Sequence, residues 1–184
     1  IIGAILTQNV SWKNVEKAIN NLKSRNIISL KDIKTAPAKV ISELIKPTRF
    51  YTQKTTKLTN FAEFFENNYN YNHEEMMKHD VWKLRKQLLK VNGIGKETAD
   101  SILLYALNKP IFVCDTYTAR ILTRLGISKN SWKYDDYQKL FMDNLPSVTG
   151  LYNDFHAQLC HLGSCICKTK PKCDECILEK ICKK

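Results

Sequence analysis

Apolar residues recur every three or four positions along most of this chain, which is the spacing that lines them up on one face of an α-helix. The stripes are Val15, Ala18, Ile19 and Leu22; Val40, Ile41 and Leu44; Leu58, Phe61, Phe64 and Phe65; Ala99, Ile102, Leu103 and Ala106; Ile121, Leu122 and Leu125; Tyr152, Phe155, Leu159 and Leu162. The one extended candidate, residues 110–113, is too short to build a sheet. We therefore predict an all-α fold.

Polar and small residues mark where these helices begin and end. Asp80 and Asp115 are suited to cap helix N-termini, and Gly126 and Gly163 are suited to close helix C-termini. The Asn-Lys-Pro segment at 108–110 is the expected seam between two lobes, residues 1–109 and residues 110–184. No apolar run approaches the roughly 20 residues of a membrane span.

The chain is strongly basic, because its 29 Lys and Arg outnumber its 18 Asp and Glu and give a net charge of +11. Clustered cations neutralise phosphates and release counterions, so nucleic acid is a natural partner. A solvated Lys-rich surface, common in thermophiles, is the alternative. The charge therefore indicates a polyanion partner only if the chain also contains a site for one.

Seven cysteines are an odd number for a disulfide framework, and the start of the chain is a poor secretion signal. Cys173 and Cys176 form a CxxC pair, and Cys182 follows after five residues. The fourth ligand of such a site is Cys167 or Cys165. A thiolate site of this kind suits zinc or an iron–sulfur cluster, and the spacing alone does not choose between them.

The segment VNGIGKETAD, residues 91–100, joins two predicted helices through Gly93 and Gly95. No strand precedes it, which disfavours a dinucleotide fingerprint. A tight glycine turn before a helix N-terminus favours binding of an anion such as phosphate. An ordinary connection between two helices is the alternative.

Asp115, after the apolar Phe112-Val113-Cys114, is by itself an ordinary N-cap, and Cys114 is expected to pack as a small apolar residue.

The order of these features, glycine turn, aspartate and cysteine tail, resembles the helix-hairpin-helix DNA glycosylases of the endonuclease III family. The closest likeness is to the 3-methyladenine DNA glycosylase III-like branch, whose members lack the lysine nucleophile. The resemblance implies a two-lobed helical fold. Its barrel domain, 1–109, would include the hairpin at about 86–107, and its second domain, 110–184, would hold the aspartate and a [4Fe–4S] loop at 167–182.

The resemblance also implies a role for particular residues. Asp115 would be the catalytic aspartate and Glu97 would line the base pocket. The expected DNA contacts are Gln8, inserted where the base was; Phe50, a wedge beside the orphaned base; and Lys54, Gly93, Gly95 and Lys96. The expected cluster ligands are Cys167, Cys173, Cys176 and Cys182, with Cys167 preferred to Cys165 because one deletion then reconciles the tail with the family's spacing.

Two further departures from the family pattern matter. The family's N-terminal helix has no counterpart in this sequence. Glu97 stands where bifunctional members have a lysine, and a carboxylate cannot form an imine. We therefore expect a monofunctional glycosylase that acts on an alkylated purine such as 3-methyladenine, or on uracil. The alternatives are a bifunctional glycosylase/AP lyase for oxidised pyrimidines, a non-catalytic hairpin module and a zinc-stapled helical adaptor.

The expected partner is double-stranded DNA that contains a damaged base, bound by a monomer without any membrane association. The reducing conditions that free thiolates need suggest the cytoplasm or nucleoid of a prokaryote, and the Lys-rich surface is compatible with a thermophile.

Overall fold

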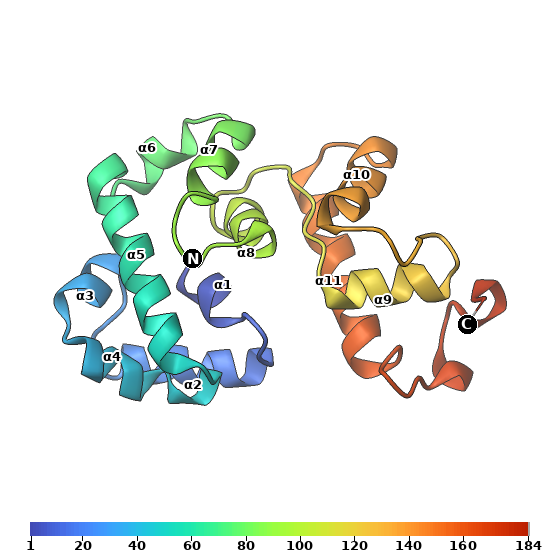
Figure 1. Cartoon of the computed structure of the whole chain (residues 1–184), viewed down its shortest axis with the longest axis horizontal. Coiled ribbons are helices and arrows are strands. Elements are labelled where there is room, and N and C mark those ends of the chain that lie inside the picture. Colours follow the sequence, from blue (N-terminus) through green and yellow to red (C-terminus); the bar gives the residue numbers. More distant parts are fainter. Residues whose placement is uncertain (184) are drawn as a thin grey trace. The chain divides into compact units, whose positions relative to one another are not determined.

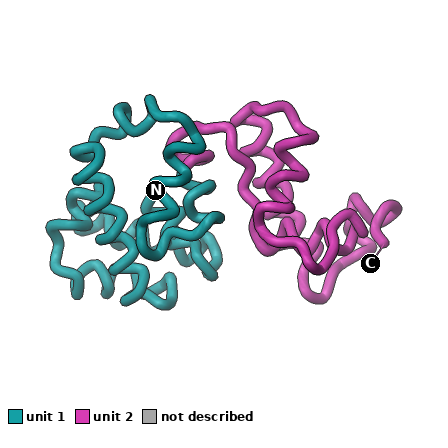
Figure 2. The backbone as a smooth tube through the Cα atoms, turned by 45° about the horizontal axis from the view of Figure 1, so that its top comes forward, with its two compact units in different colours: residues 1–102 teal, residues 103–184 magenta. Residues whose placement is uncertain are grey.

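The computed structural model describes residues 1–183, and within that range every regular element is a helix (Figure 1). The predicted all-α fold is confirmed, since residues 110–113 form no strand. Two compact units divide the chain, residues 1–102 and residues 103–184 (Figure 2). The boundary therefore falls at the start of a π-helical segment, η2 (Ile102–Ala106), a few residues before the expected seam at 108–110.

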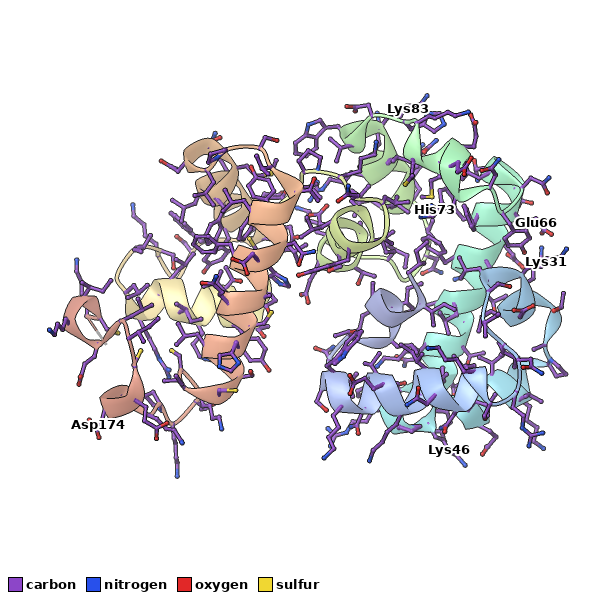
Figure 3. The ribbon with its side chains drawn as sticks, turned by 180° about the vertical axis from the view of Figure 1, so that it is seen from behind. Lys31, Lys46, Glu66, His73, Lys83 and Asp174 are labelled. Atoms are coloured by element: carbon purple, nitrogen blue, oxygen red, sulfur yellow. The ribbon has the colours of Figure 1, made fainter. Side chains whose placement is uncertain are left out.

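Unit 1 is built around one long helix. Its elements are α1 (Ile2–Leu6), α2 (Trp12–Lys23), α3 (Leu30–Thr35), α4 (Ala38–Leu44), the 3-10 helix η1 (Lys46–Thr48), α5 (Tyr51–Tyr69), α6 (His73–Met77), α7 (Val81–Leu88) and α8 (Lys96–Ser101). Helix α5 contacts α1, α3 and α4, and Leu58 and Phe61 of its apolar stripe are fully buried. Exposed lysines project from several elements, including Lys31, Lys46 and Lys83, so positive charge is spread over this unit (Figure 3).

Helices α7 and α8 form the predicted hairpin around the turn of Gly93. Asp80 caps α7 as expected, because its Oδ1 accepts hydrogen bonds from the backbone N–H groups of Trp82 and Lys83. The two helices are joined by a buried ion pair, in which Arg85 donates from Nε and Nη2 to the two carboxylate oxygens of Asp100, at 2.7 and 3.0 Å. Bidentate geometry of this kind fixes orientation as well as distance. The hairpin is therefore held in one geometry.

Unit 2 contains α9 (Thr116–Arg124), α10 (Tyr134–Asn144), α11 (Thr149–Cys165) and two 3-10 turns in the tail, η3 (Cys173–Glu175) and η4 (Glu179–Ile181). Its core includes Phe112, whose ring stacks on Phe141 with centroids 4.0 Å apart. Gly126, with φ +71°, follows α9 as predicted.

The expected end of the last helix at Gly163 is wrong, because α11 continues to Cys165. Gly163 is instead the point where α11 packs tightly on α9, since a Cβ there would lie 2.5 Å from Cβ of Tyr117. The glycine therefore permits close helix packing and does not end the helix.

None of the described helices is both long enough and apolar enough to cross a bilayer.

Candidate active site

Gln8 lies against the hairpin turn in unit 1. Its Nε2 donates to the carbonyl of Gly93 at 3.2 Å and to Oγ1 of Thr98 at 2.9 Å, and its Oε1 accepts from the ammonium of Lys57. The loop after α1 and the hairpin, distant in sequence, are thus joined by one side chain. Two of the residues expected to contact DNA, Gln8 and Gly93, are brought together.

The two glycines of the turn have different structural demands. Gly93 has φ +92°, and a Cβ there would collide with the aliphatic chain of Lys57, so the fold itself requires glycine. Gly95 has φ −88°, and a Cβ there would meet no atom within 4 Å. Gly95 is exposed, so its backbone is open to approach from outside the protein.

Lys96 and Glu97 are exposed residues of the first turn of α8, for which Gly95 is the N-cap without a side-chain cap. The positive end of a helix favours the carboxylate of Glu97 at this position.

Phe50 stands at the point where η1 passes into α5. It is 62% exposed, and it occupies the left-handed region with φ 43° and ψ 33°, directly after Arg49 with φ 54°. Residues other than glycine rarely adopt positive φ, and such strain costs about 1–3 kcal/mol per residue. Two consecutive strained residues therefore present a large apolar ring to solvent, as a wedge requires.

The structure gives Lys54 a different role from the expected contact with DNA. Its side chain is 2% exposed, and its ammonium donates to the carbonyls of Leu6 at 2.8 Å and Thr48 at 2.6 Å. These carbonyls come just before the loops that carry Gln8 and Phe50. Lys54 is therefore a buried tether between the two loops. The polar sequence around it, residues 51–57, gave no sign that its head group would be enclosed.

Asp115 is the N-cap of α9 in unit 2, and the predicted cap is confirmed. Its Oδ1 accepts from the backbone N–H of Thr118 at 2.7 Å and from Oγ1 of Thr118 at 2.9 Å. Its Oδ2 points to the other side, and the side chain is 13% exposed. One oxygen thus fixes the carboxylate through Thr118, and the other faces α11. Cys114 beside it is buried, as expected.

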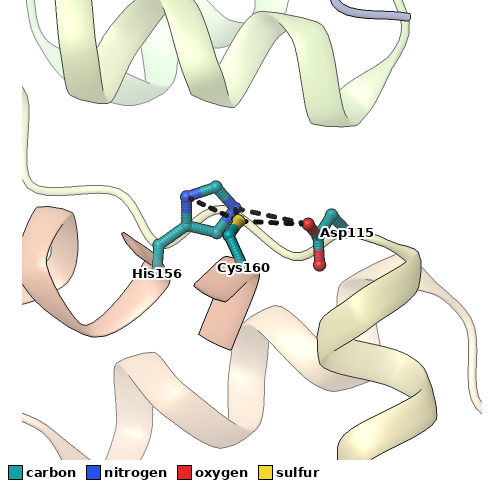
Figure 4. A group of neighbouring side chains, drawn as sticks. All are labelled: Asp115, His156 and Cys160. Atoms are coloured by element: carbon teal, nitrogen blue, oxygen red, sulfur yellow. Dashed lines mark hydrogen bonds and ion pairs between the residues drawn. The ribbon is translucent and has the colours of Figure 1, made fainter. Parts of the chain in front are cut away.

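Sequence reasoning missed the two side chains that face Oδ2 of Asp115, His156 and Cys160 of α11 (Figure 4). Cys160 donates its thiol proton to Oδ2 at 3.3 Å, and Nε2 of His156 lies 3.9 Å from the same oxygen. The signal was a His and a Cys four residues apart, on one face of the last helix, but only the packing of α9 on α11 shows which residue they face.

Burial lowers the pKa of His156, and the nearby Asp115 opposes this shift without reversing it. The imidazole is therefore neutral at ordinary pH. Tyr105 meets Nδ1 of this ring through its hydroxyl, and burial, followed by the charges of Cys160 and Asp115, raises the pKa of Tyr105. The surroundings of Asp115 in unit 2 thus contain no cation among these three neighbours.

The cysteine tail is attached to α9 through two arginines. Arg124 donates from Nη1 to Sγ of Cys167 at 3.2 Å, and Arg120 donates from Nε to the carbonyl of Cys167 at 2.8 Å. Sγ of Cys182 lies 3.5 Å from the carbonyl of Arg124. Cys165, in contrast, is exposed at the end of α11.

The spacing of the tail sulfurs bears on which group they would hold. Within residues 1–183, Asp115, His156 and Cys160 form the one group of three His, Cys, Asp or Glu side chains whose ligand atoms all lie within 4.8 Å of one another. No three sulfurs of the tail approach so closely. A tetrahedral zinc ion holds its sulfurs about 3.8 Å apart, given a Zn–S bond of about 2.3 Å. In this structure the tail sulfurs are therefore not gathered at the separations of a zinc site.

Similarity to known proteins identifies the family of this chain. The model of the HhH-GPD superfamily base excision DNA repair proteins matches residues 2–147. A protein of Methanocaldococcus jannaschii named as a DNA repair glycosylase is 45% identical over 184 residues, which cover 99% of this chain and 83% of the relative. The chain belongs to the HhH-GPD superfamily of base excision DNA repair proteins, and the expected class of enzyme, a DNA N-glycosylase, is confirmed.

Two solved structures agree with this membership. The 3-methyladenine DNA glycosylase of H. pylori (MagIII), bound to 1,N6-ethenoadenine, has a TM-score of 0.79 and 30% identity, covering 88% of this chain and 81% of that one. An endonuclease III–DNA complex has a TM-score of 0.83 and 22% identity, covering 99% and 80%. The second likeness shows the fold alone, and this fold is the endonuclease III-like one that the sequence predicted.

The buried Lys54 predicts a pH dependence of stability. Burial first, and then the charge of Lys57, lower the pKa of Lys54 from 10.5 to about 8. The unfolded chain therefore holds more protons between those two values, so raising the pH through this interval favours the folded state. The free energy of unfolding of the unchanged protein should rise relative to that of Lys54→Met from pH 8 to pH 10, as measured by urea denaturation.

Lys17→Met, which removes an exposed lysine of α2, is the matched control for this measurement. Parallel curves for the unchanged protein and Lys54→Met would show that the ammonium is not the group responsible.

Proposed function

We propose that this chain is a monofunctional DNA glycosylase, which hydrolyses the N-glycosidic bond of a damaged base and leaves an abasic site. The observation that carries the proposal is Glu97, two residues after Gly95, where the resemblance places the lysine of bifunctional members. Without an amine at that position no Schiff base forms there, so water is the nucleophile.

Asp115 is the proposed catalytic residue. Its Oδ1 is engaged by Thr118, and its Oδ2 is available to stabilise the positive charge that develops on the sugar. As the glycosidic bond breaks, the base leaves with the bonding electron pair, and a water oxygen bonds to C1′. The water proton passes to Asp115 or to solvent.

Unit 1 supplies the proposed DNA contacts. The backbone of Gly93 and Gly95, together with Lys96, would hold a phosphate, and the open surface at Gly95 supports this. Gln8 would enter the space that the base vacates, and Phe50 would wedge beside the orphaned base. The strained backbone at Phe50 supports the wedge, since such strain persists where function requires it.

An N-alkylated purine is the proposed substrate class, with uracil as the second candidate. An alkylated purine is already cationic and leaves easily, whereas uracil needs hydrogen bonds to a developing anion. The carboxylate of Glu97 suits a cationic base better than an anionic leaving group. The 30% identity to an enzyme named for 3-methyladenine supports the same class.

The proposed cofactor is a [4Fe–4S] cluster held by Cys167, Cys173, Cys176 and Cys182. An all-cysteine donor set fits such a cluster, and the resemblance of the tail to the endonuclease III family favours it over zinc. The hydrogen bond from Arg124 to Sγ of Cys167 supports Cys167 as the first ligand. When bound, the cluster would cross-link the tail to itself, next to the contacts that Arg120 and Arg124 of α9 make with Cys167.

The reaction type is tested on duplexes that carry 3-methyladenine, 7-methylguanine, uracil or an oxidised pyrimidine. We expect release of the alkylated purines, with strand breaks appearing only after alkali or heat. Asp115→Asn should lower the rate of base release by about 100-fold or more, in line with the loss of an electrostatic stabiliser. Strand cleavage without alkali would identify a bifunctional lyase, and binding without release of any base would identify a non-catalytic module.

The phosphate contact is tested with Gly95→Ala. The backbone at Gly95 suits any residue and the added methyl group meets no atom, so the variant should keep its melting temperature. Its affinity for duplex DNA should fall by about 3- to 10-fold, because the methyl group blocks approach of a phosphate. Gly150→Ala in α11, where the space is equally open, is the matched control and should bind as the unchanged protein does. Equal affinity for both variants would remove the turn from the interface.

The cofactor is tested by the iron, sulfide and zinc content of the purified chain. We expect iron and sulfide with visible absorbance, lost in Cys167→Ser and kept in Cys165→Ser. One equivalent of zinc in a colourless protein would instead support a zinc site, and the reverse behaviour of the two variants would make Cys165 the ligand.

A further inference from the structure

We propose that Asp115, His156 and Cys160 form a binding site for a zinc-class divalent ion in unit 2, and that occupancy of this site stops base release. The binding claim stands on the geometry of the three side chains. The inhibitory claim rests in addition on the proposed function, because it requires Asp115 to be the catalytic carboxylate.

Two of the three distances between the ligand atoms match those around a tetrahedral zinc ion, and the third is a few tenths of an ångström longer. Oδ2 of Asp115 lies 3.3 Å from Sγ of Cys160 and 3.9 Å from Nε2 of His156, and Sγ lies 3.5 Å from Nε2. Zinc bonds of about 2.0–2.3 Å at tetrahedral angles place oxygen, nitrogen and sulfur ligands roughly 3.3–3.6 Å apart. Small rotations of the side chains would therefore complete the site without any movement of the backbone.

The carboxylate of Asp115 and the imidazole of His156 are each already oriented by a second partner. Thr118 engages Oδ1 of Asp115, which leaves Oδ2 toward the other two ligands. The Tyr105 hydroxyl meets Nδ1 of His156, which leaves Nε2 for a metal. Metal-binding histidines in proteins are commonly held by such a contact at the second ring nitrogen. His156 and Cys160 are four residues apart on α11 and so present one face.

The chemistry of the donor set selects the kind of ion. A thiolate and an imidazole favour zinc and its neighbours over magnesium or calcium, which prefer oxygen ligands. Three protein ligands leave one tetrahedral position for water. On binding, the proton of the Cys160 thiol, now donated to Asp115, is released to solvent as the sulfur–metal bond forms.

Occupancy would change what Asp115 can do. Oδ2 would be coordinated to a dication, and the negative charge that stabilises the sugar would be neutralised. The site is also separate from the tail cysteines, since these three residues are grouped within 4.8 Å and none of them belongs to the tail.

The binding test uses Co²⁺ as a probe on the cluster-loaded full chain. We expect one equivalent of Co²⁺ with a thiolate-to-metal absorption band, displaced by Zn²⁺. The band should be lost in Cys160→Ala, and the affinity for Co²⁺ should fall at least 10-fold in His156→Gln. The matched control is His161→Gln with Cys165→Ser, a second His–Cys pair at the same spacing on α11 that, within residues 1–183, belongs to no group of three ligands. This control should bind Co²⁺ as the unchanged chain does.

Zn²⁺ titration of base release, measured against the zinc-free rate of each variant, tests the consequence. The concentration for half inhibition should rise at least 10-fold in Cys160→Ala and stay constant in the control pair, with reversal by EDTA. If Cys160→Ala fails to fold, Cys160→Val and His156→Gln carry the same comparison. An unchanged cobalt band in these variants, or its loss in the control pair, overturns the site. Cobalt bound at the site without any effect on base release upholds the site and removes Asp115 from catalysis.

Discussion

One buried ammonium, that of Lys54, organises two loops of unit 1. Lys54 donates to the carbonyls of Leu6 and Thr48, which precede the loops of Gln8 and Phe50. Each carbonyl left without a donor in the interior would cost about 1–3 kcal/mol. Enclosing the cation also has a cost, visible in its lowered pKa. The two loops consequently share one anchor, and a rigid anchor is what allows the strained backbone at Phe50 to persist.

Other residues likewise contribute both to the fold and to the candidate site. Gly93 is required by its positive φ and by the chain of Lys57, and its carbonyl also positions Gln8. Asp115 caps α9 with one oxygen and accepts from Cys160 of α11 with the other. A site built on such positions is held by the scaffold itself, because any drift of the functional atom would break a structural contact.

Local signals account for what the sequence could predict. The helical stripes, the caps at Asp80 and Asp115 and the turn at Gly126 depend on neighbours within a few residues, and all of them are present. The failures are non-local. Gly163 looked like a helix end, but its role depends on Tyr117 of another helix. Lys54 looked like a surface cation until the carbonyls that enclose it were known. The sequence did not identify His156 and Cys160 as partners of Asp115, because that contact depends on the packing of α11 on α9.

Among the described residues of unit 2, the side chains that contact Asp115 carry no positive charge. A carboxylate paired with arginine has its field largely neutralised before a substrate arrives. Here the neighbours are a thiol that donates a hydrogen bond, an imidazole kept neutral by burial and the phenol of Tyr105 behind it. With glutamate in place of an amine at position 97, the proposed monofunctional reaction would depend chiefly on this oxygen to stabilise a developing cation. The same neighbours also account for the proposed metal site. A thiol and a neutral imidazole place no fixed cation beside the carboxylate, and both are good ligands for a zinc-class ion.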